Sequence, residues 1–261
     1  MARGKPFLEI VTFSLNEDYR FPLLEVFVFL YTMATFVLSG FRASATMTGV
    51  IVAFNLVSSL TGLPMFIFVI LILKNIAYGL GSDLEKGMIQ TLFSYPLKRR
   101  LILTAKLLSA LGIALLLFLG IQVFALFILA PDVVFPYLNT VFLTYAAALG
   151  YPLLVAGLVL LLTLLLKRGG LALIMGIALF FGLSILSPIV WIYAYSAGSD
   201  LFLKVYALVN PSMVLDLHYS RGVQIWAPSF SEALLYIGGC YGLVASVFIV
   251  GYVYFERRLE I

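Results

Sequence analysis

Six long runs of apolar residues dominate this sequence, and each run is about as long as a membrane is thick. A helix needs roughly 20 apolar residues to cross a hydrocarbon core of about 30 Å. Helices suit such a core because they close their backbone hydrogen bonds within the segment. The runs therefore predict six transmembrane helices, at residues 21–39, 49–73, 107–129, 141–166, 171–193 and 234–255.

The composition excludes a water-soluble globule of this length. Of the 261 residues, 63% are hydrophobic and only 11% are charged, whereas soluble domains carry about 25% charged residues. So few charges cannot cover the surface of a soluble protein, and we predict an all-α integral membrane fold. Pro64, Pro152 and Pro188 lie inside three of the runs, where we expect them to kink a helix rather than end it.

The basic residues predict the orientation of the chain. With the N-terminus inside, all of the 16 Lys and Arg residues except Arg42, Lys204 and Arg221 fall in cytoplasmic segments. Cytoplasmic loops of membrane proteins carry such an excess of positive charge. We therefore expect a multi-pass protein of the cell membrane with both termini in the cytoplasm. Topology accounts for the basic clusters, so the expected contact is membrane lipid and not nucleic acid.

The segments outside the runs differ in pattern. Apolar residues recur at helical spacing near the N-terminus, which predicts a helix along the cytoplasmic interface, with a frayed tail as the alternative. The long external stretch predicts short helices near 201–208 and 213–217. Within one transmembrane domain, 1–261, we distinguish the interface helix 1–20, spans one and two 21–73, a cytoplasmic segment 74–106, spans three to five 107–193, an external segment 194–230, and span six with the cytoplasmic tail 231–261.

The cytoplasmic segment 74–106 begins with an amphipathic pattern. Ser82 and Asp83 are residue types that cap helix starts, and Pro96 should end the helix because the residue before a proline avoids the α region. A short amphipathic helix can dock into a groove of a partner protein or rest on the lipid interface, and the pattern alone leaves both open. One helical face collects the apolar side chains Leu84, Met88, Leu92 and Phe93.

The same segment carries an ordered series of charged residues, a glycine and a proline. Two acids, a base and a glycine precede a Leu-rich stretch, and a proline, a basic pair and a lysine follow. This order resembles the type-2 family of ABC-transporter permeases, although Met88 stands where that family usually has threonine. The C-terminal Phe255, followed by Arg257 and Arg258, is similar to the family's ending. The matching residues are Asp83, Glu85, Lys86, Gly87, Leu92, Pro96, Arg99, Arg100 and Lys106.

The resemblance implies the membrane-spanning subunit of an ABC exporter. Two such permeases, either identical or a permease and its paralogue, usually form a dimer above two cytoplasmic ATPase subunits. Their cytoplasmic segment acts as a coupling helix between ATPase and spans. The residues implied in ATPase coupling are Asp83, Glu85, Lys86, Gly87, Met88, Leu92, Pro96 and Arg99.

The chain itself has no motif for nucleotide chemistry. A P-loop needs G-x-x-x-x-G-K-[ST] to hold phosphates and Mg²⁺, and the sequence contains no such motif. We therefore expect no cofactor and no enzyme activity in this chain, with ATP and Mg²⁺ on a separate polypeptide. No metal site is expected either, because His218 and Asp216 are too few ligands for zinc.

Polar residues in two spans are candidates for a translocation path. Asn55, Ser58 and Ser59 cluster at helical spacing in the second span, and Ser184 lies in the fifth. Small polar side chains also mediate helix–helix contacts in membranes, so both roles remain open. The apolar spans favour hydrophobic or amphipathic cargo. Outside the spans, Ser229 and Glu232 have the spacing of a capping box at the start of the last helix.

Two other classes of function remain as alternatives. A secondary transporter driven by an ion gradient would place ionisable residues mid-membrane, where this sequence has almost none. A membrane-embedded lipid-modifying enzyme would need clustered carboxylates, histidines or metal ligands near the interface. The close acidic pair Asp83 and Glu85 fits the coupling pattern better than it fits a catalytic site.

Overall fold

The computed structural model describes residues 6–37, 49–94, 97–219 and 225–257, and every regular element in these ranges is a helix. In chain order the elements are α1 (Pro6–Asp18), α2 (Leu23–Phe36), α3 (Gly49–Ile72), η1 (Leu73–Leu80), α4 (Gly81–Glu85), α5 (Met88–Phe93), α6 (Arg99–Leu107), η2 (Leu108–Gly112), α7 (Ile113–Leu129), α8 (Pro131–Val134), η3 (Phe135–Tyr137), α9 (Leu138–Leu166), α10 (Gly169–Ala197), α11 (Leu201–Ala207), α12 (Ser212–Tyr219) and α13 (Phe230–Arg257).

Five helical stretches of the described chain are long and apolar enough to cross a membrane. Each contains one of the predicted spans two to six, so an apolar helix of sufficient length is confirmed at each of these five positions. The described chain is all-helical and has the architecture of a multi-pass membrane protein. The five stretches are Gly49–Glu85, Arg99–Leu129, Pro131–Leu166, Gly169–Ala197 and Phe230–Arg257.

The first predicted span, 21–39, is represented by a shorter helix. The helix α2 has 14 residues, which correspond to about 21 Å at 1.5 Å per residue. This is less than the hydrocarbon thickness of about 30 Å. The last two residues of the predicted span lie outside the described residues.

The helices extend further into the predicted cytoplasmic segment than the apolar runs suggest. The second long stretch begins at Arg99, and the first continues through η1 and α4 to Glu85. The prediction that Ser82 and Asp83 cap a helix start is therefore wrong, because both lie inside α4. The break comes at Gly87, whose φ of 72° is left-handed, a conformation that glycine adopts without the steric cost of a side chain.

Three prolines lie within long helices without ending them, as predicted. Proline has no N–H, so Pro64 leaves the carbonyl of Leu60 without its helical partner. Gln122 of α7 replaces that partner, because its Nε2 donates to the Leu60 carbonyl at 3.0 Å. The same amide donates to Thr35 of α2 and its oxygen accepts from Tyr145 of α9. Gln122 thereby joins α2, α3, α7 and α9.

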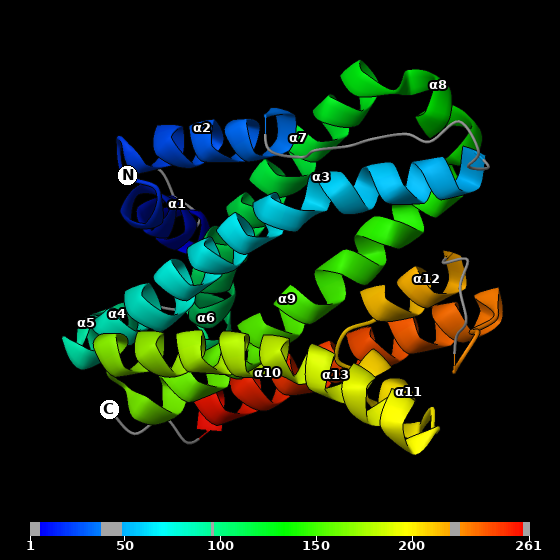
Figure 1. Ribbon diagram of the computed structural model, residues 1–261. Helices are drawn as coiled ribbons and strands as arrows, with labels where there is room; N and C mark the ends of the chain where they lie inside the picture. The colour runs from blue at the N-terminus through cyan, green and yellow to red at the C-terminus, as the bar shows by residue number, and fades with distance from the viewer. Residues whose placement is uncertain (1–5, 38–48, 95–96, 220–224, 258–261) are drawn as a thin grey trace.

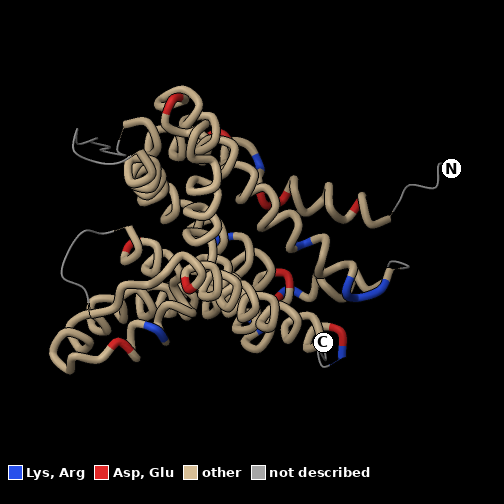
Figure 2. The backbone as a smooth tube through the Cα atoms, turned by 90° about the vertical axis from the view of Figure 1, so that its right-hand side faces the viewer, with Lys and Arg blue, Asp and Glu red and all other residues tan. Residues whose placement is uncertain are grey.

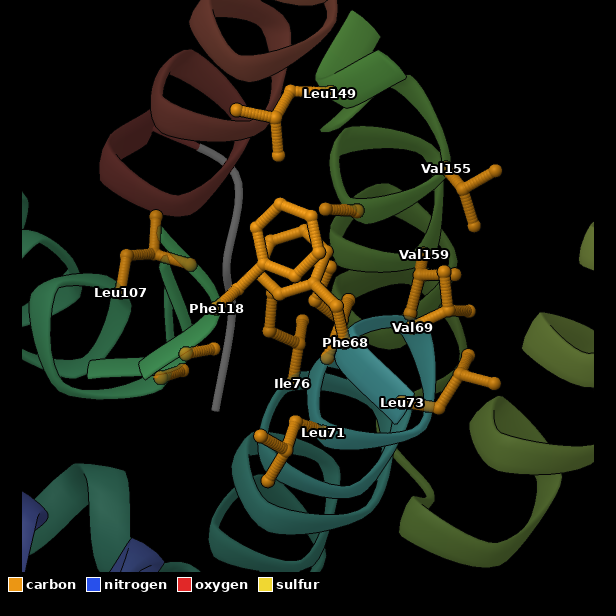
Figure 3. Packing of buried hydrophobic residues seen from close by; sticks show 14 of the residues in the cluster. Phe68, Val69, Leu71, Leu73, Ile76, Leu107, Phe118, Leu149, Val155 and Val159 are labelled. Atoms are coloured by element: carbon orange, nitrogen blue, oxygen red, sulfur yellow. The ribbon is translucent and has the colours of Figure 1, made fainter. Parts of the chain in front are cut away.

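The apolar core forms where α3, η1, α7 and α9 meet (Figure 3). Phe68 and Phe118 are fully buried at its centre, with ring centroids 5.6 Å apart. Val155 and Val159 pack from α9, and Ile76 from η1. The core therefore continues from the spans into the first part of the predicted cytoplasmic segment.

The two ends of the bundle differ in what they carry. The helices α4 and α5 lie at the same end as both chain termini, while α8, α11 and α12 lie towards the other end (Figure 1). Charged residues gather in a few short stretches and leave long parts of the helices uncharged (Figure 2). The short helices expected in the external segment are confirmed as α11 and α12. The capping box is also confirmed, with reciprocal bonds of 2.7 and 3.2 Å between Ser229 and Glu232.

Candidate functional site

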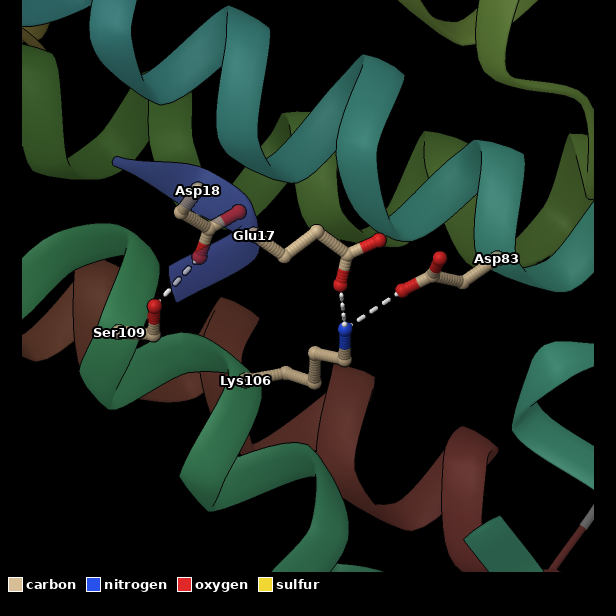
Figure 4. Close-up of polar contacts among 5 residues, drawn as sticks. All are labelled: Glu17, Asp18, Asp83, Lys106 and Ser109. Carbon is tan, nitrogen blue, oxygen red and sulfur yellow. Dashed lines mark hydrogen bonds and ion pairs between the residues drawn. The ribbon is translucent and has the colours of Figure 1, made fainter. Parts of the chain in front are cut away.

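An ion-pair cluster lies where the predicted coupling segment meets the N-terminal helix. The Lys106 ammonium contacts Asp83 Oδ2 at 2.7 Å and Glu17 Oε2 at 2.8 Å (Figure 4). Lys106 comes from α6, Asp83 from α4 and Glu17 from α1. The Lys106 and Asp83 side chains are buried, while Glu17 is partly exposed. One lysine therefore ties together the two ends of the segment 74–106 and joins both to α1.

Asp18 of α1 extends this cluster towards η1 and η2. Ser109 donates to Asp18 Oδ2 at 2.5 Å, and Lys74 Nζ donates to the Asp18 carbonyl oxygen. Burial raises the pKa of Asp18 to about 6, because removing the carboxylate from water outweighs the Ser109 hydrogen bond and the attraction of Lys106 and Lys74. Asp18 is thus a carboxyl group poised to gain a proton just below neutral pH.

Two π-helical segments, η1 and η2, flank the cluster. Tyr19 bridges them, because its hydroxyl accepts from Asn75 Nδ2 of η1 at 3.0 Å and donates to the Ala110 carbonyl of η2 at 3.2 Å. The wider turns of π-helices often occur at functional sites in long helices. The cluster therefore sits where both long helices change their winding.

A close approach of two backbones connects α4 to the start of α10. A Cβ added to Gly81 would lie 2.7 Å from the Gly169 Cα, and one added to Gly169 would lie 2.9 Å from Ser82 N. The predicted coupling residue Glu85 adds a polar contact, since its Oε2 accepts from the Gly169 N–H at 3.1 Å. A carboxylate at a helix N-terminus also interacts favourably with the helix dipole. Helix α4 and the start of α10 are therefore in direct backbone contact.

A groove of about 480 Å³ opens between α1 and the break at Gly87. On the α5 side Leu92 is buried and Met88 is partly exposed. The prediction of a single apolar face that continues from α4 into α5 is wrong at Met88. The left-handed turn at Gly87 reorients α5 and buries Ile89 in place of Met88. The groove is lined by Glu9, Ile10, Phe13, Lys86, Gly87, Met88, Thr91 and Leu92.

The end of the coupling segment contacts the last span. The Arg99 guanidinium carbon lies 4.5 Å from the centroid of the Phe93 ring, and that ring packs edge-on against Phe255 at 5.8 Å. The Tyr252 hydroxyl of α13 donates to Thr104 Oγ1 of α6 at 3.1 Å. The predicted site residue Pro96 lies outside the described residues. Among the predicted coupling residues that the structure describes, Asp83 contacts α6, Glu85 contacts α10, and Met88 and Leu92 line the groove beside α1.

The predicted path residues separate into different environments. Ser58 lines a cavity of about 180 Å³ between α3, α9 and α12. Ser59 donates to the Asn55 carbonyl at 2.7 Å. Ser184 donates to the Phe180 carbonyl at 2.8 Å and shares a second bond with Tyr151 at 2.9 Å. Of the four, only Ser58 lines this outer cavity.

Two residues of interest were missed in the sequence. Gln122 is buried at the junction of four helices, and the signal for it was an isolated amide within an apolar run. Asp216 reaches the outer cavity from α12 and was considered only as a partner of His218. The His218 ring nitrogen instead lies 2.9 Å from the Pro228 carbonyl. In the described part of the chain no three His, Cys, Asp or Glu residues come together as metal ligands.

Comparison with known proteins adds no family to this description. No family model matches the chain, and no curated protein is significantly similar to it. The functional assignment therefore stands on the residues and contacts of the chain itself.

Proposed function

We propose that this chain is the permease subunit of an ATP-driven ABC exporter, with ATP hydrolysis on a separate cytoplasmic subunit. The observation that carries the proposal is the buried Asp83–Lys106 ion pair. These residues mark the two ends of the segment that resembles the type-2 permease family. Between them the chain presents α5 and the groove against α1 at the terminus-bearing end. An ATPase bound there would push directly on this segment.

Three contacts of the segment would transmit a displacement by the ATPase to the long helices. The Asp83–Lys106 ion pair would transmit the displacement to α6, the Gly81–Gly169 contact to α10, and the Phe93–Phe255 contact to α13. Packed helices transmit small displacements because their interiors are dense and nearly incompressible. Closure of two ATPase subunits would thereby reorient spans and alternate access to the two sides of the membrane.

The same contacts favour six crossings with both termini in the cytoplasm. The N-terminal helix α1 joins the Lys106 cluster, and α13 ends beside α6. Gly49, where α3 begins, lies at the far end of a 37-residue helical stretch from Glu85. Helix α2 would belong to the first crossing, which leads from the end that carries α1 to the end where α3 begins.

A second permease copy, or a paralogue, is proposed to cover α10. This helix has 29 residues, of which only Gly169, Ala172, Gly176 and Ala194 are buried. Much of its apolar surface therefore faces outward, which suits contact with lipid on one side and a partner helix on the other. Transmembrane interfaces rely on such packing because lipid removes the hydrophobic drive for association.

The proposal is tested by purifying the tagged protein from its native membrane in mild detergent. We expect a stoichiometric P-loop polypeptide to co-purify, with ATP hydrolysis that vanadate inhibits. A lone protein without ATPase activity, reproduced in several detergents, would contradict the proposal and turn attention to the ion-driven transporter or the membrane enzyme.

Charge reversal within the groove separates coupling from assembly of the spans. Lys86→Glu changes an exposed residue of the groove, while Arg257→Glu makes the same change at the exposed end of α13. We expect Lys86→Glu to lower the amount of bound ATPase or its stimulated activity severalfold, without changing the melting temperature of the permease. Arg257→Glu serves as the matched control and should retain both. Equal behaviour of the two variants would contradict the coupling role.

A further inference from the structure

We propose that the outer cavity between α3, α9 and α12 binds a protonated or quaternary amine, and that the cargo is therefore an amphipathic cation. The cavity has a volume of about 180 Å³. As a statement about cargo, the inference rests on the proposed transport function. The cavity is lined by Phe54, Ser58, Thr61, Thr144, Ala147, Ala148, Ser212, Leu215 and Asp216.

The threonine hydroxyls of this cavity are arranged as acceptors. Thr61 Oγ1 donates to the Ser58 carbonyl at 3.1 Å, and Thr144 Oγ1 donates to the Thr140 carbonyl at 2.7 Å. Each hydroxyl donates its single proton to a carbonyl of its own helix. The lone pairs of its oxygen can therefore accept a hydrogen bond from a ligand in the cavity. A ligand that matches them must donate hydrogen bonds or carry positive charge.

Asp216 supplies the negative charge. No hydrogen bond or ion pair to its carboxylate occurs among the described residues. Asp216 lines the cavity and keeps an exposed side chain, and desolvation by the surrounding protein raises its pKa to about 6. The group is therefore mostly ionised at neutral pH, and an unpaired carboxylate beside apolar helices is stabilised by a cation.

The remaining lining favours an organic cation over a metal ion. Phe54 contributes an aromatic ring that packs against Tyr219 at 4.8 Å, and such rings attract ammonium groups. Leu215 and the alanines offer apolar contact to the carbons around a nitrogen. A single carboxylate and scattered hydroxyls are a poor match for Ca²⁺ or Mg²⁺, which need six or more oxygens in close geometry.

The location agrees with a cargo site on the outer half of the path. Ser58 and Thr61 lie in the first half of the helical stretch Gly49–Glu85, and α12 belongs to the predicted external segment. The ligand's charged head would sit at Asp216, and its apolar part would extend along the spans. The cavity thus selects the head group of the cargo by charge.

The test uses the purified protein and a single introduced thiol. Cys240 is the only cysteine of the chain, so Cys240→Ala provides the background for Ser58→Cys. The thiol is reacted with 2-aminoethyl methanethiosulfonate, which is cationic, and with the anionic 2-sulfonatoethyl reagent, and the rates are read by mass spectrometry. Ser196→Cys, an exposed site outside the cavity, is the matched control.

We expect the cationic reagent to modify Ser58→Cys roughly tenfold or more faster than the anionic one, relative to the same ratio at Ser196→Cys. Adding Asp216→Asn should abolish this preference. Methylammonium or tetramethylammonium chloride should protect the thiol, and sodium chloride at equal ionic strength should not. Absence of charge preference, absence of protection, or protection by sodium as strong as by the ammonium salts would each overturn the proposal.

One further variant separates an external ligand from a cation of the chain itself. Arg221 follows Asp216 by five positions in the sequence and lies outside the described residues. Arg221→Gln should leave the charge preference of Ser58→Cys unchanged. A preference that emerges only in Arg221→Gln would identify the arginine as the occupant and overturn the proposal. These readouts need no ATPase, so a failed co-purification would overturn the exporter function and leave the binding site standing.

Discussion

At the scale of single residues, the Lys106 cluster concentrates the charges that this apolar protein buries. Lys106 and Asp83 are both less than a tenth exposed, and a buried ion is costly unless it is paired and hydrogen-bonded. The pair is therefore held in place by the penalty for separating it. Any conformational change at α4 must carry Lys106 along or supply it with another partner, and Glu17 at 2.8 Å is such a partner.

Removing the lysine alone should therefore destabilise the protein strongly. Lys106→Met leaves Asp83 buried without its partner, which should lower the free energy of unfolding by about 3–5 kcal/mol. The double variant Lys106→Met with Asp83→Asn should recover much of the loss, as measured by thermal unfolding in detergent. Lys204→Met breaks the exposed pair with Asp200 and should have almost no effect. Equal losses in Lys106→Met and Lys204→Met would contradict this account.

Asp18 should make the stability of the protein depend on pH. Its pKa in the folded state is about 6, above the ordinary value of 3.8, so the folded state binds the proton more tightly than the unfolded state. Stability from this group is therefore greatest at low pH and is lost as the pH rises from about 4 to about 6. The total change is on the order of 3 kcal/mol.

The measurement is the melting temperature of the solubilised protein between pH 4 and pH 7. The variant Asp18→Asn should flatten the curve in this range, while Glu9→Gln, an exposed acid on the same helix, should leave it unchanged. A curve for Asp18→Asn as steep as that of the unsubstituted protein would show that other groups cause the dependence.

At the scale of elements, the sequence predicts the spans well and their ends poorly. Any helix within the hydrocarbon core needs about 20 apolar residues, whether it faces lipid or other helices, so spans two to six could be located from hydropathy alone. The helix through Ser82 and Asp83 could not be located in this way, because tertiary contacts to α6 and α10 override the local capping preference. The Asp83–Lys106 contact joins residues on two different helices. Their order in the sequence suggested a shared role, but only the folded chain shows the two side chains 2.7 Å apart.

The contact between α4 and α10 yields a prediction at this scale. Gly169→Ala places a methyl group 2.9 Å from the backbone of α4, so the two helices must separate. We expect a loss of about 1–3 kcal/mol in stability from this overpacking, and reduced stimulation of the ATPase by cargo. Gly170→Ala is the matched control, because nothing lies within 4 Å of the added Cβ. Thermal unfolding of both variants measures the difference, and similar melting temperatures would contradict a tight α4–α10 contact.

At the scale of the whole molecule, the Lys106 cluster fixes which ends lie together. Helix α1, the break at Gly87 and the end of α13 all gather around α6. We therefore expect an even number of crossings. Five crossings would separate the N-terminal and C-terminal helices, which the shared contacts with α6 oppose.

Single cysteines test this arrangement in intact cells. In the Cys240→Ala background, Thr12→Cys, Ser94→Cys and Glu256→Cys place exposed thiols on α1, at the end of α5 and near the end of α13, and Ser196→Cys places one near the end of α10. A membrane-impermeant maleimide should label only Ser196→Cys, and all four should react after permeabilisation. Labelling of Thr12→Cys in intact cells would place α1 outside. If Ser94→Cys stayed unlabelled, Glu17 and Lys106 would be separated by the membrane, which a contact of 2.8 Å does not permit. Labelling of Thr12→Cys, Ser94→Cys and Glu256→Cys together would instead invert the orientation.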